Sequence, residues 1–337
     1  MAVMTVAGPI EPCELGLTLM HEHLFFDFRC YFRAATSATE RRLAREELRI
    51  STLGRCRFAP FAVEDNLVNG DLELVVREVL SAKSYGVRTI VDPTPIGCGR
   101  DPVALRRVAF LLGMNIIMGT GYYIDIGLPE DVRTRSVKEM EEILVGEVQE
   151  GIHGVKAGLI GEVGTSAPIT REEEKSLRAA ARAQRRTLVP LMVHLDGWAR
   201  EGHHVLDIVS EEGAPLEKVV LCHMNPCWHD VDYQESLAER GAYLEYDMMG
   251  MAFLYPPDKC CPDDLSVLRT IARLMKDGYG KNILMSQDVF LKCMFRAYGG
   301  SGYTHIFENL APLYQAAGIS EDNLALILVD NPRRLFS

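Results

Sequence analysis

The sequence lacks the features that would assign it to several simple classes of protein. It has nine cysteines but no CxxC motif, so neither a zinc ribbon nor a thioredoxin-type redox site is indicated. It has no apolar stretch long enough to span a bilayer, and its first residues lack a basic segment followed by an apolar one. It also lacks an excess of positive charge: the net charge of -11 argues against nucleic acid or an anionic membrane as a partner. We therefore expect a cytoplasmic protein with free thiols.

The length and composition are those of a globular chain. With 337 residues, of which 47% are hydrophobic and 25% charged, the chain can bury a large core without disulfides. We expect a single domain over residues 1–337, because α/β barrels of this length commonly fold as one unit.

Short apolar runs alternate along the sequence with longer segments of helical period, which is typical of parallel βα units. Eight such runs occur, at residues 17–26, 89–95, 115–122, 155–163, 188–194, 219–223, 242–247 and 283–289. Eight strands alternating with helices favour a closed (β/α)8 TIM barrel, and an open doubly wound sheet is the alternative. No GxGxxG follows the first run, which disfavours a dinucleotide-binding fold.

The connection after the first predicted strand is unusually long. Residues 28–68 separate that strand from the first barrel helix, and a polar helix is predicted over residues 37–49 within them. In a barrel, an insertion after a strand lies over the mouth. We therefore interpret this insertion as a candidate lid.

Residues that commonly bind metals recur where the predicted strands end. They are His21, His23, Glu162, His194, His223 and Asp288. Catalytic groups of a TIM barrel lie at those ends. Along a strand, alternation directs His21 and His23 to one face and Glu22 to the other. The alternative, a set of hydrogen-bonded core histidines, requires several polar groups to be buried together with separate partners. The pattern therefore favours a metal site.

A second set of residues is expected to support this site rather than to bind metal. Asp92, Glu245 and Asp247 are candidates to orient a histidine by accepting its other N–H group. Cys222 precedes His223 and is therefore expected to face away from the metals, which argues against a catalytic thiol. His229 and His305 are not expected to bind metal directly, because neither ends a strand.

Several motifs resemble those of the phosphotriesterase family in the amidohydrolase superfamily. They are TLMHEHL at 18–24, the segment 158–166, SQDV at 286–289, GGSGYTHI at 299–306 and NP at 331–332. They follow one another in the family's order over nearly the whole chain. YLEYD at 243–247 and the insertion around Cys30 are most similar to the phosphotriesterase-related protein branch.

The resemblance implies two divalent metal ions at the barrel mouth. His21, His23 and Asp288 would hold the buried ion, and His194 and His223 the more exposed one. Zinc is the expected metal, while manganese, cobalt and nickel suit the same nitrogen and oxygen ligands.

The resemblance also implies that Glu162 bridges the two ions, in the place of the carboxylated lysine of other branches. Lys156, six positions earlier on the same strand, is expected near the barrel bottom and ranks below Glu162 as a bridge. His223 is followed by Met224-Asn225-Pro226, without the acidic residue found there in lactonase-type members. The glutamate and this missing acid both argue against organophosphate hydrolysis.

Two ions of this kind activate a bridging hydroxide for attack on an electrophilic centre. Asp288 is expected to transfer the proton, while Tyr123 and Arg296 are candidates to bind the substrate. The expected reaction is cleavage of a small ester, lactone or amide. A phosphotriester or phosphoester hydrolase is one alternative, and a non-catalytic ligand-binding barrel with structural metals is another. The partner is a small molecule, and the sequence leaves the oligomeric state open, a homodimer included.

Overall fold

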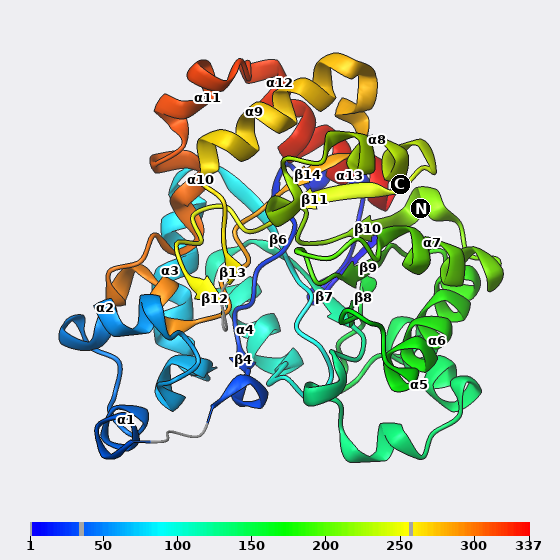
Figure 1. The fold of residues 1–337 in the computed structure, drawn as a ribbon. Helices are drawn as coiled ribbons and strands as arrows, with labels where there is room; N and C mark the ends of the chain where they lie inside the picture. The colour runs from blue at the N-terminus through cyan, green and yellow to red at the C-terminus, as the bar shows by residue number, and fades with distance from the viewer. Residues whose placement is uncertain (1, 34–36, 256–258) are drawn as a thin grey trace.

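The fold is an eight-stranded parallel barrel surrounded by helices (Figure 1), in a computed structural model that describes residues 2–33, 37–255 and 259–337. The strands lie in the order β3-β6-β7-β8-β9-β10-β11-β14, and every neighbouring pair is parallel. Their bounds are β3 (Leu17–Leu19), β6 (Val87–Asp92), β7 (Asn115–Thr120), β8 (Leu159–Gly164), β9 (Leu191–His194), β10 (Val219–Leu221), β11 (Tyr243–Tyr246) and β14 (Ile283–Met285).

Hydrogen bonds join the two ends of this strand order. The N–H group of Asp288 donates to the carbonyl of His21 at 3.1 Å, and the N–H group of His21 donates to Ser286 Oγ at 3.0 Å. The strand order also follows the chain without the reversal that defines a doubly wound sheet. The predicted TIM barrel is therefore confirmed.

One apolar residue from each strand or its end fills the barrel interior. These residues form a single buried cluster: Met20, Val91, Ile117, Leu159, Met192, Val220, Tyr243 and Leu284. Val3 of β1 (Val3–Thr5), which pairs with β2 (Gly8–Ile10), belongs to the same cluster, as does Phe336 of α13 (Asn331–Phe336). The two chain ends thus help to close the barrel at the end away from the strand C-termini.

Helices follow the strands and cover the barrel from outside. The main ones are α3 (Leu72–Ser84), α4 (Pro102–Leu112), α5 (Val137–Gln149), α6 (Arg171–Thr187), α7 (Gly202–Glu211), α8 (Val231–Glu239) and α9 (Asp264–Leu274), followed by α10 (His305–Glu308), α11 (Ala311–Ala317), α12 (Glu321–Ala325) and η13 (Leu326–Asp330). Thr170 and Glu173 form the predicted capping box of α6, and Asp101 caps α4 as predicted. Among the described helices, none is both long and apolar enough to cross a membrane.

The described part of the segment 28–68 carries two α-helices rather than the one predicted. It holds η2 (Arg29–Tyr31), α1 (Ala38–Ala44), α2 (Ile50–Phe58), η3 (Glu64–Leu67) and the start of β5 (Val68–Asn69), which pairs antiparallel with β4 (Phe26–Asp27). The predicted helix over 37–49 is wrong in its second half, because Arg49 is extended, with φ of -144°, at the start of α2. Asp65 accepts the N–H of Leu48 at 2.9 Å between the two helices.

A buried ion pair links the α4 and α5 regions of the barrel wall. The two terminal nitrogens of the Arg100 guanidinium donate to Glu147, at 2.7 and 3.0 Å, and the side chains are only 5% and 11% exposed. We expect Glu147→Gln to lower the free energy of unfolding by about 3–5 kcal/mol, because it leaves a buried guanidinium without its counter-charge. Glu142→Gln is the matched control: Glu142 pairs with Arg186 at the surface, where such a loss costs under about 1 kcal/mol. Denaturant titration of both variants checks this, and equal losses would contradict it.

Candidate metal centre

The structure brings the six predicted ligand residues together at the C-terminal end of the barrel. They form two groups of three: His21, His23 and Asp288, and Glu162, His194 and His223. In each group the potential ligand atoms all lie within 4.8 Å of one another.

Glu162 lies between the two groups and faces both. Its Oε1 is 3.5 Å from Nε2 of His23, and its Oε2 is 3.0 Å from Nδ1 of His194. Burial would raise the pKa of Glu162, but the nearby imidazoles, His194 first among them, hold it well below its usual value. Glu162 is therefore a buried carboxylate with one oxygen directed to each group.

His21 provides a direct test of whether these residues fit a metal. Its Nδ1 lies 3.2 Å from Oε2 of Glu245 and 3.3 Å from Oδ2 of Asp247. Its Nε2 points towards Glu162 and Asp288, and it is buried without a hydrogen-bond partner among the residues that the structure describes. An unpartnered buried nitrogen is costly. A metal ion bound at this nitrogen would remove that cost. The imidazole and carboxylate ligands of the two groups suit divalent ions such as zinc.

His223 is held by Asp247, as the alternation along β11 predicts. Its Nδ1 lies 3.0 Å from Oδ1 of Asp247, and its Nε2 lies 2.7 Å from Nδ1 of His194. Burial alone would lower the pKa of His223, but Asp247 and Glu162 raise it to about 10. In the absence of a metal ion, a protonated His223 therefore balances the charge of Asp247 and Glu162. A bound metal ion would take over that role.

The expectation for Asp92 is only partly met. Nδ1 of His23 lies 2.8 Å from Oγ1 of Thr94, so Thr94 and not Asp92 orients this ring. Asp92 accepts the N–H groups of Thr94 and Leu24, each at 3.0 Å, and thereby fixes the loop that carries the threonine. Glu22 points away from the centre as predicted and accepts the N–H of Val289 at 3.0 Å.

The expectation that Cys222 faces away is wrong. Cys222 packs in the barrel-interior cluster and lies with His21, Glu245 and Asp247 in a group of potential ligand atoms within 4.8 Å. Alternation from the buried Val220 directs Cys222 inwards, and His223 reaches the site only because its φ of 62° breaks the strand geometry. Burial raises the pKa of Cys222 well above its usual value, so it is a thiol beneath the site and not a nucleophile.

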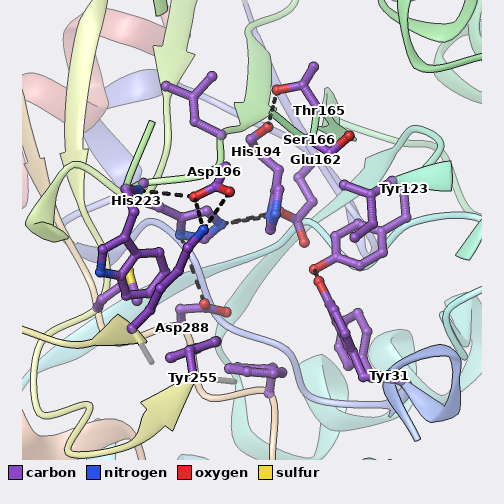
Figure 2. Close-up of a pocket in the computed structure, with 18 of the residues that line it drawn as sticks. Tyr31, Tyr123, Glu162, Thr165, Ser166, His194, Asp196, His223, Tyr255 and Asp288 are labelled. Atoms are coloured by element: carbon purple, nitrogen blue, oxygen red, sulfur yellow. Dashed lines mark hydrogen bonds and ion pairs between the residues drawn. The ribbon is translucent and has the colours of Figure 1, made fainter. Parts of the chain in front are cut away.

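A cavity of about 210 Å³ opens on this centre. His23, Glu162, His194, His223 and Asp288 lie in its wall, together with seven aromatic side chains, of which Figure 2 labels Tyr31, Tyr123 and Tyr255. The aromatic residues are Phe28, Tyr31, Phe61, Tyr123, Trp198, Tyr255 and Phe290.

Of the two predicted substrate contacts, the structure places one at the cavity. The ring of Tyr123 lies 5.0 Å from that of His194, and its hydroxyl is 2.7 Å from the hydroxyl of Tyr31. Arg296, in η11 (Arg296–Tyr298), is not among the described residues that line the cavity, and its guanidinium donates to Glu308 at 2.6 Å. Two other cations, Arg33 and Lys259, line the cavity instead. The sequence did not indicate either of them, because neither stands at the end of a barrel strand.

The remaining candidates lie outside the centre. Lys156 precedes β8, is partly exposed and packs beside Gly151. His305 contacts Asp264 at 2.8 Å, and His229 lies near Arg200 at the surface. None of the three is in the groups of potential metal ligands found among the described residues.

Comparisons with known proteins place nearly the whole chain in one family. The model described as the phosphotriesterase family matches residues 1–336. The chain is similar to an N-acetyltaurine hydrolase of Dictyostelium discoideum, with 33% identity over 99% of this chain and 97% of that protein. It is similar to a phosphotriesterase-related protein of Nematostella vectensis, with 33% identity over 98% and 96%. A crystal structure of a resiniferatoxin-binding protein from Rhodobacter sphaeroides shares 46% identity with a TM-score of 0.97, over 100% of this chain and 95% of that one.

Proposed function

The chain belongs to the phosphotriesterase family, and from this premise we propose that it is a binuclear metal-dependent hydrolase that cleaves the amide bond of a small N-acyl compound. The observation that carries the proposal is the pair of ligand groups that open on a cavity, with one oxygen of Glu162 directed to each group. The ions have to be reachable by substrate for catalysis, whereas a structural metal site is closed.

Each of the two groups of residues would hold one metal ion. His21, His23 and Asp288 would hold one ion, His194 and His223 would hold the other, and Glu162 would contact both. When bound, the ions supply Lewis acidity, which polarises the substrate carbonyl and lowers the pKa of a water molecule. Nitrogen and oxygen ligands of this kind suit zinc first, with manganese, cobalt or nickel as alternatives.

Two side chains of the cavity then act on the substrate. Asp288 lines the cavity and is positioned to take a proton from the attacking water and deliver it to the leaving amine. Burial raises the pKa of Tyr123 well above its usual value, so this side chain stays a phenol and can donate a hydrogen bond to the substrate oxygen. Tyr31, at 2.7 Å, fixes the position of that hydroxyl.

An amide is favoured over an ester, a lactone or a phosphoester by the similarity to N-acetyltaurine hydrolases along the whole chain.

A second candidate function is binding without turnover. It is favoured by the similarity to the resiniferatoxin-binding protein. Cavity-lining ligand groups argue against this second function, because binding alone does not require an open metal site.

We expect the zinc-loaded protein to contain about two ions per chain and to hydrolyse N-acetyltaurine faster than an acetate ester, a lactone or a phosphotriester. Removing metal with a chelator should abolish this turnover, and adding zinc back should restore it. Metal analysis and product release measured on one preparation check the prediction. Two bound ions without turnover of any substrate would favour the binding function, and turnover that survives metal removal would contradict the metal-dependent mechanism.

A further inference from the structure

Four aromatic rings form a continuous wall along one side of the cavity, and we call them the aromatic belt: Tyr31, Phe61, Tyr255 and Trp198. Consecutive ring centroids are 4.8, 5.9 and 5.1 Å apart, and all four side chains line the cavity. Tyr31 and Phe61 come from the insertion 28–68, Trp198 follows β9, and Tyr255 is in β12 (Leu254–Tyr255). The belt therefore joins the insertion to loops from the second half of the barrel.

Each end of the belt carries a cation. The N–H group of Arg33 donates to the carbonyl of Phe61 at 3.3 Å, and Nζ of Lys259 lies 5.2 Å from the centroid of the Trp198 ring. Both side chains line the cavity. Lys259, in β13 (Lys259–Cys260), also donates to Asp196 at 2.7 and 3.0 Å. Asp196 is labelled beside the site in Figure 2.

Among the residues that the structure describes, the charge on this side of the cavity is positive. Apart from the ligand groups, the charged residues found there are Arg33, Lys259 and Asp196. Asp196 offsets one of the two cations. Within residues 2–33, 37–255 and 259–337, no ion pair or hydrogen bond engages the exposed guanidinium of Arg33. One positive charge therefore faces the cavity without a counter-charge from the described residues.

Resting on the proposed function, we infer that Arg33 and Lys259 form a subsite for an anionic group of the substrate. These two side chains would then set the preference for amides that carry an anionic group over neutral ones. A guanidinium presents paired N–H donors that match these oxyanions. The ammonium of Lys259 has three donors, of which two directions are taken by Asp196, so it retains one for the substrate. The belt supplies the apolar surface between the anion and the reacting amide.

The test compares two substrates that differ in this charge. N-Acetyltaurine carries a sulfonate, and N-acetylethanolamine carries a neutral hydroxyl at the same place. We expect Arg33→Gln to lower kcat/KM for N-acetyltaurine by about 10- to 100-fold, mainly through KM, because it removes a charge-assisted contact. The kcat/KM for N-acetylethanolamine should change less than about 2-fold. Equal losses on both substrates, or no loss on either, would overturn the inference.

Arg29→Gln is the matched control. Arg29 lies in the same insertion but pairs with Asp27 and Glu64 instead of lining the cavity, so its loss should leave both substrates unaffected. Asp196→Asn tests the sign of the effect. It removes the competing carboxylate from Lys259, so it should strengthen binding of the anionic substrate and leave the neutral one unchanged. Weaker binding of N-acetyltaurine to this variant would count against the subsite.

A binding measurement separates the subsite from the reaction. We expect ethanesulfonate to bind the metal-free protein, and calorimetry should give a Kd about 10-fold or more weaker for Arg33→Gln. If no amide is hydrolysed but this difference holds, the proposed reaction fails and the subsite stands. If amides are hydrolysed but ethanesulfonate binds both proteins equally, the subsite fails and the reaction stands.

Discussion

Glu162→Gln should cost the protein at least one of the two proposed ions and most of its hydrolytic turnover, with kcat reduced by about 10³-fold or more. Glu162 is buried between the two ligand groups and directs one oxygen to each. Glutamine keeps the shape of this side chain but removes the negative charge that offsets two dications, and its amide N–H groups would face a cation. Metal analysis and kcat on the purified variant measure both effects.

Lys156→Met is the control for this prediction, because a carboxylated lysine is the competing bridge. We expect it to keep both ions and near-normal kcat, since Lys156 is partly exposed and lies before β8. A glutamate bridge is permanent, so metal reconstitution of the wild-type protein should not need bicarbonate. If Lys156→Met empties the site while Glu162→Gln retains two ions, the bridge has been assigned to the wrong residue.

Asp288→Asn should lower kcat by about 10²- to 10⁴-fold, the range for loss of a positioned proton-transfer group. Asp288 lines the cavity with Oδ1 3.2 Å from Nε2 of His23, and its amide analogue can still offer an oxygen to an ion but cannot carry the proton. Metal content should therefore fall less than turnover does.

The leaving group provides the internal control for Asp288. An alkyl amine must be protonated to leave, whereas p-nitrophenolate leaves without a proton. We expect the loss in kcat to be larger for N-acetyltaurine than for p-nitrophenyl acetate, with both measured on the same metal-loaded preparation. An equal loss on both substrates would show that Asp288 acts only by holding metal.

The residues at the strand ends could be predicted because the barrel places all strand C-termini at one mouth. His21, His23 and Glu162 could be located from the count of strands, and the two-residue period put His21 and His23 on one face. The direction of Cys222 could not be predicted in the same way. His223 enters the site through a left-handed φ, and Asp288, with φ of 47°, does so too. Backbone geometry of this kind leaves no trace in a hydrophobic pattern.

The positively charged residues of the cavity could not be predicted, for a different reason. Arg296 follows the last strand, but the loop that carries it folds into short turns, and its guanidinium pairs with Glu308 and Thr304. Arg33 and Lys259 come from segments more than 200 residues apart, and only the folded aromatic belt brings them to one cavity. The insertion itself was evident from its length, whereas its division into α1 and α2 depended on the single extended residue Arg49.

The aromatic belt also limits how this active site can be re-engineered or diversified. Phe61 of the insertion and Tyr255 of β12 pack edge to face across the boundary between these two segments, so the position of each segment depends on the other. If only one of these segments were replaced by that of a relative, its aromatic side chains would not match the ring of the other segment. The two loops therefore form one transplantable unit, and specificity in such barrels is expected to change by paired exchange of both.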